Sequence, residues 1–135
     1  MLSPRELVTL VQFKSKQQEN DFNGSQIWPL LKAILLDADN YSKANLNADI
    51  VVTSIIRSYA EDIALHGSGI HCTGRAGDVR IKAWDDPNAL AIAAYLNGKY
   101  LYDPARTTLK VAFMEPHGDG PHIHCQVHAR TTQIN

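Results

Sequence analysis

Two histidines and one aspartate of this chain have the residue types and the spacing of a metal centre. His71 and Asp78 lie seven positions apart around a Gly-Arg-Ala turn, and His124 follows 46 residues after Asp78. Two imidazoles and one carboxylate can bind zinc as three protein ligands and leave a fourth position for water or substrate. This number of ligands indicates a catalytic zinc site, because structural zinc sites are closed by four protein ligands.

A further histidine, His122, lies two positions before His124 in a segment that has the composition of a strand. Residues i and i+2 of a strand point to the same face of the sheet. If one of these imidazoles binds the metal, the other therefore stands beside the bound water. Gly74 permits backbone angles that other residues avoid, so a turn there can bring His71 and Asp78 together.

Two segments of the chain resemble a known family. His71-x3-Gly74-Arg75-Ala76-x-Asp78 resembles the signature of the D-alanyl-D-alanine carboxypeptidase family of zinc peptidases. That superfamily includes bacterial dipeptidases, phage endolysins and the zinc-containing signalling domain of hedgehog proteins. The segment His122-Ile123-His124-Cys125 resembles the corresponding hedgehog segment and is similar to the Gly-Pro-His-x-His strand of lysostaphin-type endopeptidases. The resemblance covers about residues 50–129.

The resemblance implies a role for each matching residue. His71, Asp78 and His124 would be the zinc ligands. His122 would lie beside the metal-bound water. The stretch that ends at Arg57 resembles the strand before the motif in the carboxypeptidases, whose arginine faces the reacting carbonyl. Arg57 would then stabilise the negative charge that builds on the carbonyl oxygen.

The general base has more than one candidate. Carboxypeptidase-like members of the family place an acid three residues before the last ligand. Counting back from His124 gives Pro121, which cannot take a proton, whereas counting back from His122 gives Asp119. Two registers remain: His124 as ligand with His122 as base, or His122 as ligand with Asp119 as base. The first is preferred, because the hedgehog-like and lysostaphin-like segments agree on it. Glu115 is a further candidate acid, within reach only if its loop folds back.

The function implied by the resemblance is that of a zinc-dependent peptidase. It would hydrolyse peptide bonds of bacterial cell-wall peptidoglycan, as a D-Ala-D-Ala carboxypeptidase or as an endolysin-type endopeptidase. Its substrates would be stem peptides or D-amino-acid peptides. The alternative is a non-catalytic zinc-binding interaction module like the hedgehog domain. A third interpretation is a zinc-free domain with histidines in its core.

The elements around these residues predict an α+β fold. Helices are predicted for residues 4–18, for residues 28–38 beginning at Pro29, and between an N-cap at Asp85 and a C-cap at Gly98. Polar loops are predicted for residues 17–25 and 40–47, and strands for residues 50–57, 79–81, 109–114 and 122–128. This order indicates a small, mainly antiparallel sheet flanked by helices, similar to hedgehog and D-Ala-D-Ala peptidase domains. The N-terminal helices would span about residues 4–38 and the metal-site core about residues 50–129.

Length and composition predict one folded domain over residues 1–135. The net charge is −1 and there is no basic run, which argues against binding of nucleic acid or of an anionic membrane. No apolar stretch is long enough to span a bilayer. The N-terminus does not resemble a signal peptide, so we expect cytoplasmic synthesis, with release to the cell wall if the protein is phage-encoded. Cys72 and Cys125 each follow a proposed ligand and are expected to face away from the metal as small buried groups.

Overall fold

The computed structural model describes residues 11–56, 63, 70, 73–116 and 120–134. Its main element is a five-stranded sheet with the strand order β1-β2-β3-β6-β5. The strands are β1 (Gln12–Phe13), β2 (Ile50–Ser54), β3 (Ala76–Ile81), β5 (Ala112–Glu115) and β6 (His122–Gln126). β1 and β2 are parallel, and the other neighbouring strands are antiparallel. The prediction of an α+β fold with a small, mainly antiparallel sheet is therefore confirmed.

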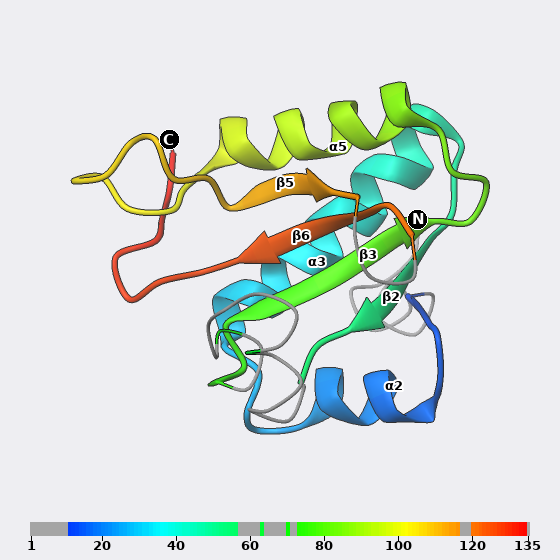
Figure 1. Cartoon of the computed structure of the whole chain (residues 1–135), viewed down its shortest axis with the longest axis horizontal. Coiled ribbons are helices and arrows are strands. Elements are labelled where there is room, and N and C mark those ends of the chain that lie inside the picture. The colour runs from blue at the N-terminus through cyan, green and yellow to red at the C-terminus, as the bar shows by residue number, and fades with distance from the viewer. Residues whose placement is uncertain (1–10, 57–62, 64–69, 71–72, 117–119, 135) are drawn as a thin grey trace.

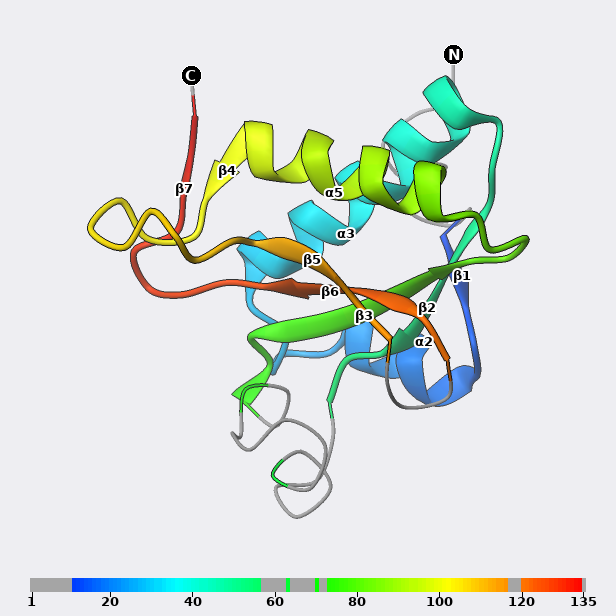
Figure 2. The same ribbon diagram turned by 45° about the horizontal axis from the view of Figure 1, so that its top comes forward.

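Two helices cover one face of this sheet (Figures 1 and 2). α3 (Pro29–Tyr41) contacts β3 and β6, and α5 (Asp86–Lys99) contacts β5 and β6. The shorter helix α2 (Lys16–Asn23) contacts β1 and β2. A second sheet of two strands pairs β4 (Tyr100–Leu101) with β7 (Thr132–Gln133). Within the described part of the chain, no helix is long and apolar enough to cross a membrane.

The alternation of residues along the strands decides what each face of the sheet carries. Ile123 and Cys125 of β6 belong to the hydrophobic core that also contains Leu35 of α3 and Ile92 of α5. Cys125 is fully buried in this core, as predicted for a small apolar group, while Cys72 lies outside the described residues. Because successive strand residues point to opposite faces, the other residues of β6 are left on the face that the helices do not cover.

The starts of α3 and α5 are as predicted from their capping residues. Pro29 is the first residue of α3, and the Asp85 side chain caps α5 by accepting a hydrogen bond from the Asn88 backbone N–H. The prediction that α5 ends at a Gly98 cap is wrong, since the helix continues to Lys99. The physical reason is the pairing of the next residues with β7, which draws the chain out of the helix at β4.

Three other predictions of local structure are wrong. The predicted helix over residues 4–18 extends into a segment where Gln12 and Phe13 instead pair with β2. The helix of this region begins later, at α2, and occupies most of the predicted loop 17–25, with Ser15 as its N-cap. The predicted linker 40–47 is also helical, because the π-helix η1 (Ser42–Leu46) continues α3. In the first case a pairing between distant segments overrides the local helical pattern.

The Gly-Arg-Ala turn holds the beginning of β3 in place. Gly74 has a positive φ of 75°, and a Cβ there would lie 2.0 Å from the backbone oxygen of Gln26. Arg75 donates hydrogen bonds from Nε to the Val127 carbonyl, at 3.0 Å, and from Nη2 to the Tyr102 hydroxyl, at 3.0 Å. The glycine therefore allows a close approach of two chain segments, and the arginine ties the turn to the end of β6.

Replacing Gly74 by alanine is expected to destabilise the protein strongly. The substitution combines an unfavourable positive φ with a clash against backbone that cannot turn away, so we expect a loss of about 2–5 kcal/mol of unfolding free energy. Gly98→Ala is the matched control, because no atom lies within 4 Å of a Cβ at that position in α5. It is expected to be neutral or to stabilise by about 0.5–1 kcal/mol. Chemical denaturation of both variants measures the difference, and equal stability would contradict this role of Gly74.

Candidate metal centre

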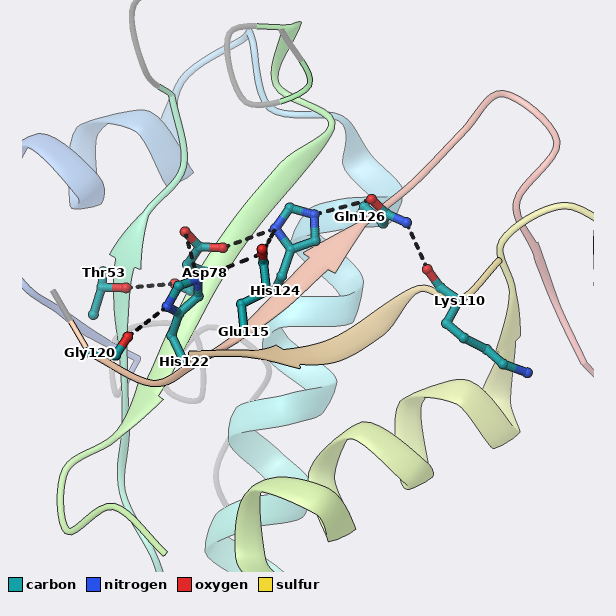
Figure 3. Close-up of polar contacts among 8 residues, drawn as sticks. All are labelled: Thr53, Asp78, Lys110, Glu115, Gly120, His122, His124 and Gln126. Atoms are coloured by element: carbon teal, nitrogen blue, oxygen red, sulfur yellow. Dashed lines mark hydrogen bonds and ion pairs between the residues drawn. The ribbon is translucent and has the colours of Figure 1, made fainter. Parts of the chain in front are cut away.

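The pairing of β3, β6 and β5 brings four ionisable side chains together. Asp78 of β3 lies opposite His124 of β6, and Glu115 of β5 lies opposite His122 of β6. Directly opposed residues of antiparallel strands point to the same face of the sheet. All four side chains therefore converge on the face that α3 and α5 do not cover (Figure 3). Asp78 and His124 are each only 2% exposed there.

The distances within this group are those of direct contacts. His124 Nδ1 lies 3.2 Å from Asp78 Oδ1 and 3.1 Å from Glu115 Oε1. His122 Nε2 lies 3.8 Å from Asp78 Oδ2 and 3.7 Å from Glu115 Oε1. Asp78, Glu115 and His122 each offer one ligand atom, and these three atoms lie within 4.8 Å of one another. Two carboxylates and two imidazoles thus share one buried position.

Hydrogen bonds to the outer nitrogens fix which atom each imidazole presents to the carboxylates. Gln126 Nε2 donates to the Lys110 carbonyl at 2.9 Å, so its Oε1 faces His124 Nε2, at 3.1 Å (Figure 3). His124 Nε2 then carries a hydrogen, and Nδ1 faces the acids. His122 Nδ1 lies 3.1 Å from the Gly120 carbonyl, which can only accept. His122 therefore donates from Nδ1 and presents Nε2.

The electrostatics of the centre favour a positive charge between the acids. Burial by itself lowers the pKa of His124, but the hydrogen bonds and negative charges of Asp78 and Glu115 outweigh burial and raise this pKa to about 9. Burial, with a smaller contribution from the Asp78 charge, raises the pKa of the Cys125 thiol far above its ordinary value. The thiol is therefore protonated and takes no part in the centre, whereas His124 carries a charge between the acids when no metal ion is bound.

The residues of the centre fit a bound zinc ion. Zinc bonds to nitrogen and oxygen of about 2.0–2.1 Å, at tetrahedral angles, place neighbouring ligand atoms roughly 3.3 Å apart. The observed separation of 3.2 Å between Asp78 Oδ1 and His124 Nδ1, which form a hydrogen bond, is close to that spacing. Imidazole and carboxylate are also ligand types that zinc takes in catalytic sites. Gln126 would then hold the outer nitrogen of a ligand histidine, as such sites require.

The described residues contain three of the six sites predicted from the sequence. Asp78, His122 and His124 lie together, and of these the strand spacing predicted that His122 and His124 share a face. The other three, His71, Arg57 and Asp119, lie outside the described residues.

Two residues of the centre were missed or misjudged at the sequence level. Glu115 was expected to reach the site only if its loop folded back, and this expectation is wrong. Glu115 is the last residue of β5 and lies directly opposite His122. Gln126 was not predicted, although its position two residues after His124 on the same strand places it on the same face.

Comparison of the chain with protein-family models, with curated proteins and with solved structures finds no match. The resemblance to zinc peptidases therefore stays a prediction made from the residues.

Proposed function

We propose that this protein is a zinc-dependent peptidase that acts on the peptides of bacterial cell-wall peptidoglycan. The observation that supports it most is the contact of Asp78 with His124 at 3.2 Å, beside a second carboxylate and a second imidazole. In this proposal Asp78 and His124 hold the metal together with His71, which the family resemblance supplies as the third ligand. A zinc ion held by these residues would supply Lewis-acid chemistry at the scissile carbonyl and a bound water acidic enough to react at neutral pH.

His122 is proposed as the general base. Its Nδ1–H is held by the Gly120 carbonyl, so the lone pair of Nε2 faces Asp78 and Glu115. Nε2 takes a proton from the attacking water while the new carbon–oxygen bond forms. The same proton passes to the leaving amine when the carbon–nitrogen bond breaks. The Glu115 carboxylate, 3.7 Å away, stabilises the imidazolium that exists between these steps.

Two further roles belong to residues that, like His71, lie outside the described part of the chain. Arg57 would stabilise the oxyanion. Asp119 would act as the base in the other register, in which His122 is the ligand.

A non-catalytic zinc-binding module is the second candidate function. Pro121 favours it, because this residue occupies the position where carboxypeptidase-like members of the family carry their acid.

Removal of the metal tests the proposal directly. We expect the purified protein to contain roughly one zinc per chain and to clear a suspension of cell walls. Chelator treatment should abolish the clearing, and added zinc should restore it. Zinc without any clearing would favour the non-catalytic module. Full activity in a metal-free preparation would exclude the zinc peptidase altogether.

A further inference from the structure

A pocket of about 390 Å³ adjoins the metal centre on the side of β2. Asp78 and His122 line the pocket and also belong to the centre, so a ligand in the pocket lies against both. Thr53 and Gly120 line the same pocket, and both lie on the His122 side of the centre (Figure 3). Gln126 lies on the opposite side in that view. The centre therefore has room for part of a substrate on the side of β2.

Three cationic side chains line this pocket: Lys14, Arg80 and Lys82. Among the described residues that line it, Asp78 is the only acid. The whole chain has 13 basic and 14 acidic residues, so its overall charge does not account for this local excess. The described residues that line the pocket therefore carry more positive than negative charge.

The strand order brings these cations together from separate parts of the chain. Lys14 follows β1, and its backbone N–H donates to the Val52 carbonyl of β2 at 2.9 Å. Arg80 lies on β3 opposite Val51 of β2, and Lys82 follows β3 directly. Since β2 lies between β1 and β3, the three side chains reach the pocket from both of its neighbours.

Arg80 lies beside the turn that leads into β6. A Cβ at Gly120 would lie 2.7 Å from Arg80 Nη1, so the guanidinium packs against the turn that precedes His122. Guanidinium and ammonium groups together bind carboxylate and phosphate oxygens by charge-assisted hydrogen bonds. We propose that this pocket is an anion subsite, which binds a negatively charged oxygen group of the substrate while the scissile bond lies at the metal centre.

The substrate part of this inference rests on the proposed peptidase function, whereas anion binding can be measured without it. Chelator-treated full-length protein is titrated with sodium phosphate, and separately with sodium acetate, at constant ionic strength with sodium chloride. Backbone amide chemical shifts of Thr53 and Gly120 report binding. We expect saturable shifts with at least one of the two anions. Saturation by acetate indicates a carboxylate group, and saturation by phosphate alone indicates a phosphate group.

Substitutions that each remove one lysine charge test which lysines bind the anion. Lys14→Gln and Lys82→Gln should each weaken anion binding by roughly 3- to 10-fold. Both lysines are exposed, and thermal unfolding of each variant checks that the fold is kept. Lys110→Gln is the matched control, because this exposed lysine makes the same charge change and its side chain points away from the centre (Figure 3). Absence of saturable shifts, or an equal loss of binding in the control, would overturn the anion subsite.

A second measurement separates this inference from the proposed function. In the zinc-loaded protein, the double variant Lys14→Gln/Lys82→Gln should raise KM for a peptide with a free carboxylate more than for its amide. Its zinc content and kcat should stay close to those of the unchanged protein. If acetate saturates the site but the zinc-loaded protein hydrolyses peptides without such a split in KM, the pocket does not bind the substrate and the peptidase stands. If anion binding is confirmed but no peptide is hydrolysed, the peptidase function is wrong and the anion site stands.

Discussion

Asp78→Asn is expected to remove both zinc and hydrolytic activity. Asp78 contacts His124 and His122 and is a ligand in both registers derived from the sequence. It is also one of the three described residues whose ligand atoms cluster within 4.8 Å. Asparagine keeps the shape of the side chain but loses the negative charge that attracts the cation. We therefore expect zinc affinity to fall at least about 100-fold, with a parallel loss of cell-wall hydrolysis.

Zinc content and thermal unfolding are measured on the same preparation, because a loss of zinc identifies a ligand only if the variant is folded. Asp49→Asn is a suitable control, since Asp49 is exposed and precedes β2, away from the centre. The control should keep its zinc and its activity. A folded Asp78→Asn variant that retains one zinc per chain would show that the metal is not held at this position.

Single substitutions of His122 and His124 are expected to differ in their effect on bound zinc, although both should lower the rate of hydrolysis. His124→Ala should lose zinc, because His124 Nδ1 is the proposed ligand atom and Gln126 orients it. His122→Ala should keep zinc but lower kcat by roughly 10²- to 10⁴-fold, the usual contribution of a general base. Zinc analysis and initial rates on the same preparations measure both effects. His124→Gln serves as a second variant if alanine in this buried position prevents folding.

The reverse pattern would assign the ligands differently. If His122→Ala loses zinc while the His124 variants retain it, the metal is held by Asp78, Glu115 and His122. His128→Ala is the control for both, because His128 packs against Tyr102, with ring centroids 5.7 Å apart, and takes no part in the centre. Loss of zinc in that control would point to a general effect on folding.

Local sequence signals predicted the regular elements that need no distant partner. Pro29 and Asp85 placed the starts of α3 and α5, because a first-turn proline and an N-cap carboxylate act within a few residues. The same reasoning failed at Gln12, where pairing with β2 overrides a helical pattern, and at Gly98, where β4 ends the helix one residue later. These failures share a cause, since both segments are shaped by strands from elsewhere in the chain.

Part of the candidate metal centre could be predicted from strand periodicity. His122 and His124 had to share a face, because alternate residues of any strand do so. The position of Asp78 opposite His124 does not follow from periodicity. It is set by the pairing of β3 with β6, which joins residues 46 positions apart in the sequence. Glu115 could not be placed from the sequence, because its role depends on whether the last residue before the turn pairs with β6.

The sequence by itself determined the residue types of the centre, the face shared by its histidines and the α+β class, since these follow from local spacing and composition. Only the tertiary structure decided that Glu115 and Gln126 join them and that Lys14, Arg80 and Lys82 line one pocket beside them. The reason is physical: a cross-strand register and a strand order are set by the packing of the whole sheet against α3 and α5, and no short stretch of sequence contains that information.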